Sequence, residues 1–223
     1  EMNYVDFISL LAETNRCPGG KRTIQKIIQS TFIGPQCQVL EVGCNTGFTS
    51  LEIARVSKAR VEGIDVVNTA VDEANRVLRM DTEEIQNKVN FVVGSALDIP
   101  YATNEFDLLV VGGATSFIDN KSQAISEYYR VLKPWGFLSA TNLCYLEKPP
   151  AEIVRKVSEV IGVEINGHLR TGRVFSSMRM TLKSINKKNT ISSRCRMKSS
   201  GHLSSTFCVN PTLVSWTLTS KRQ

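Results

Sequence analysis

VLEVGCNTG, residues 39–47, is the stretch of this chain that decides its fold. An apolar run of strand type, Val39 to Val42, leads into a glycine loop, and a helical pattern begins directly after the loop at Phe48. A unit of strand, glycine loop and helix gathers backbone N–H groups and the positive end of a helix dipole at one edge. The stretch therefore predicts a site for a small ligand that carries carboxylate, phosphate or ribose groups.

The acidic residue within this stretch narrows the kind of ligand. Glu41 stands near the end of the predicted strand, where a carboxylate would repel a pyrophosphate and could help to hold a cationic amino group. Gly43 and Gly47 would let the backbone turn sharply and approach the ligand closely. A purely structural turn is the alternative, because a single glycine-rich loop is a weak signal.

Strand and helix patterns alternate along the chain as far as residue 161. Residues 106–111 are nearly all apolar, which is expected of a strand whose two faces are both covered by helices. Strands that alternate with helices predict an α/β fold: a Rossmann-like, doubly wound and mostly parallel sheet with helices on both faces. The predicted strands are residues 39–42, 61–66, 89–93, 106–111 and 137–141, and the predicted helices lie within 3–13, 24–34, 48–56, 70–78, 125–132 and 151–161.

Three segments of this region resemble the class I methyltransferases that depend on S-adenosylmethionine (SAM), in particular the small-molecule enzymes of the ubiquinone and sterol type. They are residues 39–47, the fourth-strand segment 106–113 and the helix–turn–strand segment 130–138. The resemblance runs from there to about residue 142. It implies that SAM is the cofactor and that its methyl group passes by in-line displacement to a small-molecule acceptor. Because such a reaction depends on proximity and orientation, no catalytic side chain is assigned.

Asp65 ends the second predicted strand, 18 residues after Gly47. An acidic residue in this position suits a bidentate hydrogen bond to the two hydroxyls of a ribose, as in dinucleotide-binding folds. A helix N-cap or a solvated strand end is the alternative role.

The resemblance further implies that residues 94–100, after the third strand, bracket the adenine of the cofactor. Ser95 stands where similar enzymes often carry an acid for the exocyclic amine, and Asp98 either substitutes for that acid or is a solvated turn residue. The candidates for apolar cover over the base, each of which could instead belong to the core, are Ile64, Val66, Ala96 and Leu97.

Two further segments would face the reacting end of the cofactor. The resemblance places Gly112 and Gly113 against the transferring methyl, with Thr115 and Ser116 either facing substrate or capping the loop. Residues 15–23 resemble a lid whose backbone and Thr23 contact the methionine carboxylate, with a plain helix start as the alternative. Asn45 stands where the family usually carries a third glycine. The predicted cofactor-binding residues are Gly20, Thr23, Glu41, Gly43, Cys44, Asn45, Gly47, Asp65, Val66, Ser95, Ala96, Leu97, Gly112 and Gly113.

The composition also indicates whether disulfides, metal sites or membrane spans are to be expected. The 6 cysteines show no C-x-x-C spacing and there are only 2 histidines, so we expect reduced thiols and no metal site. No apolar run reaches the roughly 18 residues of a membrane span and no leader pattern opens the chain, so we expect a soluble, cytoplasmic protein.

Charge divides the chain into two unlike parts. Residues 1–164 hold all 21 acidic residues against 16 basic ones, whereas residues 165–223 hold 11 basic residues and no acid. A stretch of that length ordinarily carries about seven acids. The resemblance implies an N-terminal helical lid (1–36) and a SAM-binding core (37–164), and the change in charge marks a basic, Ser/Thr-rich tail (165–223). Because the family's sheet normally continues beyond this point, we expect the tail to leave the sheet edge incomplete or irregular. Residues 174–182 and 213–218 are the candidate strands of this tail.

Two explanations of the tail and one rival enzyme stay open. A frameshift or other non-homologous sequence would explain the loss of acids, and so would phosphate contacts in an RNA-associated methyltransferase or a non-catalytic nucleic-acid-binding protein. The nucleic-acid explanation is disfavoured because the tail has only three aromatic residues and no recognised binding motif. An NAD-linked Rossmann oxidoreductase would require the G-x-G-x-x-G pattern, which the loop lacks.

Overall fold

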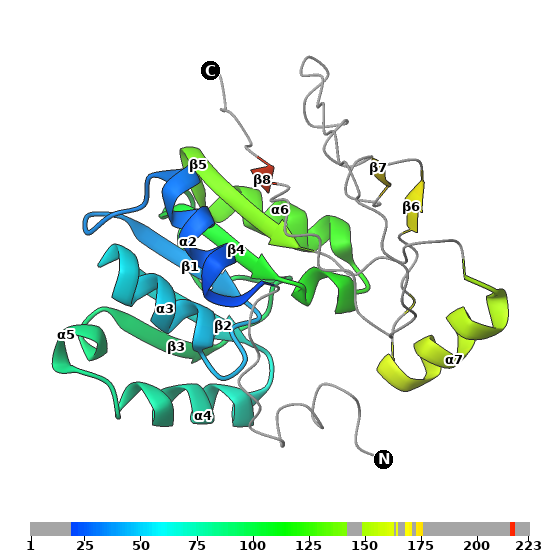
Figure 1. Cartoon of the computed structure of the whole chain (residues 1–223), viewed down its shortest axis with the longest axis horizontal. Coiled ribbons are helices and arrows are strands. Elements are labelled where there is room, and N and C mark those ends of the chain that lie inside the picture. The colour runs from blue at the N-terminus through cyan, green and yellow to red at the C-terminus, as the bar shows by residue number, and fades with distance from the viewer. Residues whose placement is uncertain are drawn as a thin grey trace.

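The central sheet explains how residues far apart in the sequence come to one edge. A computed structural model of the chain describes residues 19–141, 149–162 and 164, with the backbone of residues 168–170, 173–175 and 215–216. Six strands form one sheet in the order β3-β2-β1-β4-β5-β8, and the first five are parallel (Figure 1). Their bounds are β1 Gln38–Val42, β2 Arg60–Asp65, β3 Val89–Val93, β4 Phe106–Gly112, β5 Leu132–Thr141 and β8 Ser215–Trp216. The predicted doubly wound α/β sheet is confirmed.

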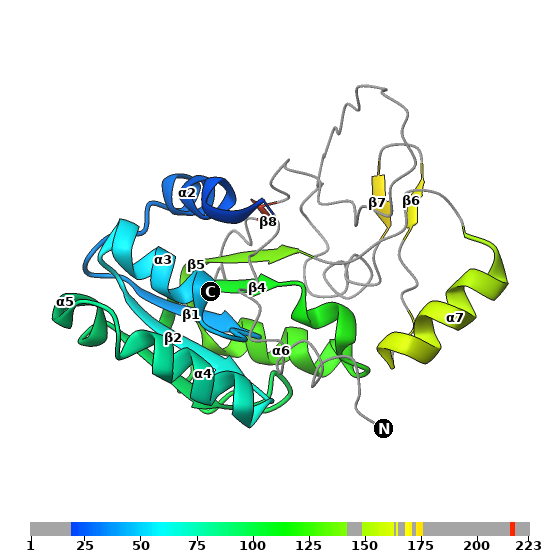
Figure 2. The same ribbon diagram turned by 60° about the horizontal axis from the view of Figure 1, so that its bottom comes forward.

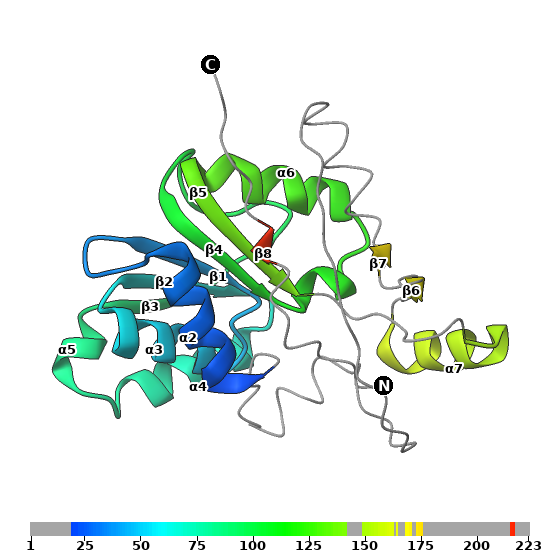
Figure 3. The same cartoon turned by 45° about the horizontal axis from the view of Figure 1, so that its top comes forward.

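Helices cover both faces of this sheet, as the apolar strands require. One face is covered by α2, α3, α4 and the short α5, and the other face is covered by α6 (Figure 3). The bounds of these helices are α2 Gly20–Thr31, α3 Phe48–Ser57, α4 Asn68–Leu78, α5 Glu83–Gln86 and α6 Lys121–Val131, with a 3-10 turn η1 at Ala114–Phe117. The sequence predicted all of them except α5 and η1, which are too short for a periodic pattern.

The alternation of side chains along β1 connects the two layers. Val39 is fully buried in the cluster beneath α2 and α3, and its neighbour Leu40 is fully buried in the cluster beneath α6. Successive side chains of a strand point to opposite faces, so a strand buried on both faces must be continuously apolar. Glu41 is the exception in this strand, and it is buried as well.

The connection from α6 to β5 differs from the prediction. We expected Pro134 to end the helix and the strand to begin at Phe137, but β5 begins at Leu132, directly after α6. Phe106 pairs with Leu132 and Leu108 with Phe137, so the intervening residues of β5 form a bulge. Trp135 there has a positive φ of 69°, and a Cβ on Gly136 would lie 2.9 Å from a backbone oxygen. A bulge accommodates Pro134 because the ladder needs no N–H there.

The C-terminal elements lie beside this core. Helix α7, Ala151–Ile161, is present as predicted, has no buried residue and stands away from the sheet (Figures 1 and 2). Strand β8 pairs antiparallel with β5 at Leu138 and Ser139 only. The hairpin of β6, His168–Arg170, and β7, Arg173–Phe175, forms a second small sheet. β7 and β8 overlap the predicted stretches 174–182 and 213–218, whereas β6 was not predicted. The other residues of those two stretches, like the predicted helix 3–13, lie outside the described residues.

The lengths of the helices also bear on membrane insertion. Among the described residues, no helix has both the length and the apolar character to cross a bilayer.

Candidate functional site

The candidate site lies at the carboxyl ends of β1, β2 and β4. The chain leaves β1 toward β2 on one side, whereas β4 lies on the other side of β1, so the direction of winding reverses between β1 and β4. In open α/β sheets, loops that leave such a switch point diverge and leave room for a ligand. The loop of residues 43–47, Asp65 and the pair Gly112-Gly113 all meet at this edge.

The loop after β1 is held by its own backbone. The N–H groups of Gly43 and Cys44 both donate to the carbonyl of Ile64, at 2.8 and 3.0 Å, and the Gly47 N–H donates to the Cys44 carbonyl at 2.9 Å. Asn45 has a φ of 45° and accepts the Thr46 N–H through its side-chain oxygen at 2.7 Å. Asparagine therefore adopts the left-handed backbone that the family's third glycine would supply.

The two loop glycines are required by close packing. Gly47 has a φ of 84°, and a Cβ there would lie 2.6 Å from the ring of Phe91. Gly43 has a φ of 77°, and a Cβ there would lie 2.5 Å from Ala114. Gly43 thus brings the loop against the start of η1, and Gly47 brings the start of α3 against β3.

Asp65 connects the ends of β1 and β2. Its Oδ2 accepts the backbone N–H of Asn45 at 2.9 Å, and its Oδ1 accepts the backbone N–H of Val67 at 3.0 Å. Each carboxylate oxygen has a second acceptor position beyond the bond it already makes. The N-cap residue of α4 is Val67 itself, without a side-chain cap bond, so Asp65 is not the helix N-cap of its alternative role. Half-buried Asp65 keeps acceptor capacity beyond its two bonds.

Glu41 does not face outward from the strand end. It is 3% exposed, and its Oε2 accepts the hydroxyl of Ser50, in the first turn of α3, at 2.6 Å. Burial raises the pKa of Glu41 to about 7, although the hydrogen bonds from Ser50 and Thr49 oppose this rise. Sequence reasoning missed Ser50. The signal for it is a polar residue one turn before the apolar Ile53 and Ala54 on α3.

Cys44 is buried, and burial raises the pKa of its thiol well above the ordinary value. The side chain therefore stays a neutral thiol that packs beneath the loop, and only its backbone is placed at the site.

Of the four apolar candidates at the ends of β2 and β3, two are exposed and two are enclosed. Val66 is 64% exposed and Leu97 is 37% exposed, whereas Ile64 and Ala96 are buried in the core cluster beneath α6. For Ile64 and Ala96, the core role is therefore the one that the structure supports.

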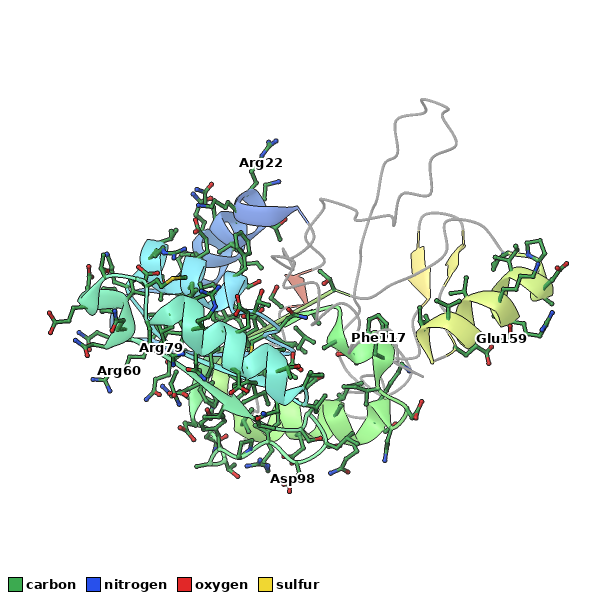
Figure 4. All side chains as sticks on the ribbon, turned by 90° about the horizontal axis from the view of Figure 1, so that it is seen from below. Arg22, Arg60, Arg79, Asp98, Phe117 and Glu159 are labelled. Atoms are coloured by element: carbon green, nitrogen blue, oxygen red, sulfur yellow. The ribbon has the colours of Figure 1, made fainter. Side chains whose placement is uncertain are left out.

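The polar residues of the same loop form a tight turn. Ser95 Oγ accepts the Leu97 N–H at 3.1 Å, and the Asp98 N–H donates to the Ser95 carbonyl at 3.2 Å. Asp98 is exposed and projects from the rim of the molecule (Figure 4).

The end of β4 is open on one side. Gly112 is exposed, and Gly113 has a φ of 115° with no atom of the described residues within 4 Å of the place where a Cβ would stand. Thr115 and Ser116 are buried instead of facing this space. The Thr115 hydroxyl lies 3.1 Å from the hydroxyl of Tyr128 on α6. Of the two roles weighed for Thr115, the structure supports the structural one.

The first turn of α2 reaches α3 through an ion pair. Lys21 Nζ lies 3.2 Å from Oε2 of Glu52, which is itself 5% exposed. Gly20 and Thr23 are half-buried in the same turn, and Thr23 Oγ1 stands where a Cβ on Gly19 would lie. The hydroxyl of Thr23 is thus folded back against the start of its own helix. Within the described residues, no group of three His, Cys, Asp or Glu side chains could hold a metal ion.

Comparison with known proteins agrees with this arrangement. A family model described as "Methyltransferase domain" matches residues 40–140. The demethylmenaquinone methyltransferase of Symbiobacterium thermophilum is 30% identical over 114 residues, which are 50% of this chain and 45% of that protein. The crystal structure of the MccD protein is 30% identical with a TM-score of 0.62, over 68% of this chain and 66% of that one.

One similar structure belongs to a protein named for a different reaction. The crystal structure of "the [4+2]-Cyclase SpnF" is 28% identical with a TM-score of 0.54, over 59% of this chain and 48% of that one. The chain spans 44 to 66% of the length of the first curated relatives that it matches.

Proposed function

Because this chain belongs to the class I SAM-dependent methyltransferase family, we propose that it binds SAM at the edge formed by β1, β2 and β4 and transfers its methyl group to a small-molecule acceptor. When bound, SAM supplies an electrophilic methyl on a sulfonium. The protein supplies orientation, proximity and exclusion of water. The family to which the chain belongs gives no support to the NAD-linked oxidoreductase weighed above.

The observation that carries the proposal is the carboxylate of Asp65 beside the loop. It fixes the loop through Asn45 and still has acceptor capacity for the two hydroxyls of a ribose. Gly43 and Gly47 keep the adjacent backbone free of side chains, so a ligand can approach it closely.

The exposed apolar residues support an adenine site next to this ribose. Val66 follows Asp65 directly, and Leu97 lies in the turn after β3, the next strand of the sheet. Large apolar side chains left exposed at a strand end gain free energy when a flat base covers them. Ser95 and Asp98 are the side chains of this loop that could accept a hydrogen bond from the exocyclic amine of the base.

Glu41 supports the amino-acid end of the ligand indirectly. Its carboxyl group lies beneath the loop and is held by Ser50, and its pKa is about 7, so we propose that its ionised form acts by its charge on the ligand's ammonium group. We also propose that the acceptor approaches the methyl group of SAM from the open side at Gly113. Gly20 and Thr23 belong to a lid whose earlier residues lie outside the described residues.

Calorimetric titration with SAM and S-adenosylhomocysteine (SAH) tests the cofactor site. We expect Asp65→Ala to weaken SAH binding at least about tenfold, the equivalent of one hydrogen bond to a charged group. Asp107→Ala is the matched control, because Asp107 also accepts a backbone N–H, from Gln38 at 2.8 Å, but stands at the opposite end of the sheet. Equal SAH affinity in Asp65→Ala and the wild type would remove the ribose assignment. Tight NADH binding without SAH binding would contradict the proposed function itself.

Methyl transfer needs a separate measurement, because a protein with a similar fold, SpnF, is named as a cyclase. Radioactive methyl-labelled SAM should be incubated with the protein and a panel that contains a demethylated quinol, a sterol and a phenolic polyketide. Label in one of the extracted products supports the transferase. SAH binding together with an unlabelled panel would leave a SAM-binding protein with a different acceptor or no transfer.

The division into lid, core and tail is also a proposal. We propose that residues 165–223 are out of frame or otherwise non-homologous, because they hold no acid among 59 residues. Sequencing of the coding DNA tests this: an alternative frame that encodes an acidic, apolar strand–turn–strand pattern supports it. RNA binding that depends on salt and disappears on deletion of residues 165–223 would instead favour the nucleic-acid role.

A further inference from the structure

The loop that follows β3 is fastened to α6 by three side chains of one helix face. Gln123, Glu127 and Arg130 are spaced by four and three residues, so they form a single stripe on α6. We call these residues the α6 stripe.

The α6 stripe bonds to the loop at every second residue. Gln123 Nε2 donates to the carbonyl of Leu97 at 3.2 Å. At Ile99, the N–H donates to Oε2 of Glu127 at 2.8 Å and the carbonyl accepts from Arg130 Nη2 at 2.8 Å. Arg130 Nη1 donates to the Tyr101 carbonyl at 2.7 Å. The loop therefore lies along α6, and the side chains of the α6 stripe hold it through its backbone groups.

The stripe is also held together internally. Arg130 Nε and Nη2 donate to the two carboxylate oxygens of Glu127, both at 2.7 Å. The guanidinium of Arg130 lowers the pKa of Glu127, so the pair is ionised. The planar guanidinium of Arg130 thus bonds at once to the carbonyls of Ile99 and Tyr101 and to the carboxylate of Glu127, and it fixes their relative positions.

The loop segment between its two anchors carries the residues that face the proposed adenine site. It begins where the Gly94 N–H donates to the Asp65 carbonyl at 2.9 Å and ends where Tyr101 Oη donates to Glu62 on β2 at 2.8 Å. Leu97 and Ser95 lie between these points. The bonds of the α6 stripe at Leu97 and Ile99 therefore help to fix the position of this turn relative to Val66.

We propose that Gln123, Glu127 and Arg130 are positioning residues that set how strictly the site distinguishes adenine from other bases. This inference rests on the proposed SAM site. None of the three touches the ligand on this proposal; they act by holding the Ser95–Leu97 turn in a fixed place before the ligand binds, which lowers the ordering cost of binding.

The test compares SAH with S-inosylhomocysteine, whose base carries a carbonyl in place of the exocyclic amine and an N–H in place of the acceptor N1. In the wild type we expect SAH to bind up to about tenfold tighter, the worth of one well-placed hydrogen bond. In Arg130→Met the ratio of the two dissociation constants should fall to near one. Arg130→Lys can reach one carbonyl but not both, so its ratio should lie between these values.

Arg76→Met is the matched control. Arg76 makes the same two-nitrogen contact with Glu73 three residues earlier, at 2.7 Å for both bonds, but on the exposed side of α4. The ratio in this variant should equal that of the wild type. Thermal unfolding of each variant is measured beside the titrations, so that lost stability is separated from lost discrimination.

Several outcomes overturn the inference. An unchanged ratio in Arg130→Met, or a loss of affinity that is equal for both ligands, assigns the α6 stripe a structural role only. If the wild type binds SAH and S-inosylhomocysteine equally well, there is no discrimination for the α6 stripe to set, and its role is again structural only. If Arg130→Met does not fold, Gln123→Ala decides, since it removes only the exposed 3.2 Å bond and should still lower the ratio measurably. Failure of the wild type to bind SAH contradicts the proposed function instead.

Discussion

The backbone N–H of Asn45 donates to Oδ2 of Asp65 at 2.9 Å, so a carboxylate at the end of β2 holds the tip of the loop that leaves β1. The other oxygen of the same carboxylate accepts the N–H of Val67, where α4 begins. One side chain therefore joins a strand end, a loop and a helix start. This arrangement lets Asp65 prepare the site before any ligand arrives, because the loop is already in place.

Replacing Asp65 with asparagine should destabilise the fold as well as the site. An amide offers one oxygen in place of two, so one of the two N–H groups would face an NH₂ group and lose its acceptor. We expect the free energy of unfolding to fall by about 1–3 kcal/mol, as for a partly buried donor left unpaired. Urea unfolding of Asp65→Asn measures it, with the exposed Asp119→Asn as the control. A loss no larger than that of the control would contradict the bonding described here.

Gly47 should tolerate alanine much less than Gly162 does. Both have a positive φ, 84° and 77°, so both substitutions carry backbone strain. Only Gly47 is crowded, since a Cβ there meets Phe91 at 2.6 Å, whereas nothing lies within 4 Å of one on Gly162. We expect Gly162→Ala to cost about 1 kcal/mol of unfolding free energy and Gly47→Ala about 2 kcal/mol more. Thermal unfolding of the two variants side by side is the measurement. Similar losses would mean that β3 can shift to make room.

Glu41 should make the protein less stable as the pH rises. Burial raises its pKa in the folded state to about 7 from a reference value of 4.5, so between these values the folded state binds the extra proton. Stability therefore falls as the pH rises through this window, and the loss is complete above about pH 7, at roughly 3 kcal/mol. Below pH 4.5 both states are protonated and Glu41 contributes no pH dependence.

Glu41→Gln provides the measurement of this effect. The amide oxygen can still accept the Ser50 hydroxyl, but nothing titrates. Urea unfolding at pH 5 and pH 8 should show a smaller decline for Glu41→Gln than for the wild type. Glu159→Gln, on the exposed surface of α7, should keep the decline of the wild type. A decline that is unchanged in Glu41→Gln would assign the pH dependence to other groups.

The strands and the site edge were predictable because they rest on local pattern. Strands buried on both faces read as apolar runs, and the carboxyl ends of parallel strands meet at one edge, so the loop of residues 43–47 and Asp65 follow from the sequence. The direction of Glu41 does not follow from it, since it depends on the packing of α3, which brings Ser50 against the strand.

Contacts across long separations explain the other differences. Glu127 and Ile99 are 28 residues apart and Arg130 and Ile99 are 31, and no periodicity of the sequence pairs a helix face with an irregular loop. The sequence therefore gives no sign that Arg130 reaches the loop after β3. The bulge at Pro134 was likewise read as the end of a helix, because proline removes a ladder donor whether the chain stops or bulges.

Thr115 and Tyr128 should behave as a coupled pair within the core. Their hydroxyls lie 3.1 Å apart and both side chains are at most 1% exposed. Removing one hydroxyl leaves the other buried without this bond, so Thr115→Val and Tyr128→Phe should each lower the unfolding free energy by about 1–2 kcal/mol. The double variant should lose less than the sum of the two, with a coupling of about 1 kcal/mol. SAH affinity should stay unchanged in Thr115→Val. Additive losses together with weakened SAH binding would instead indicate that the Thr115 hydroxyl faces the ligand site, which is the other role that its position after Gly113 suggests.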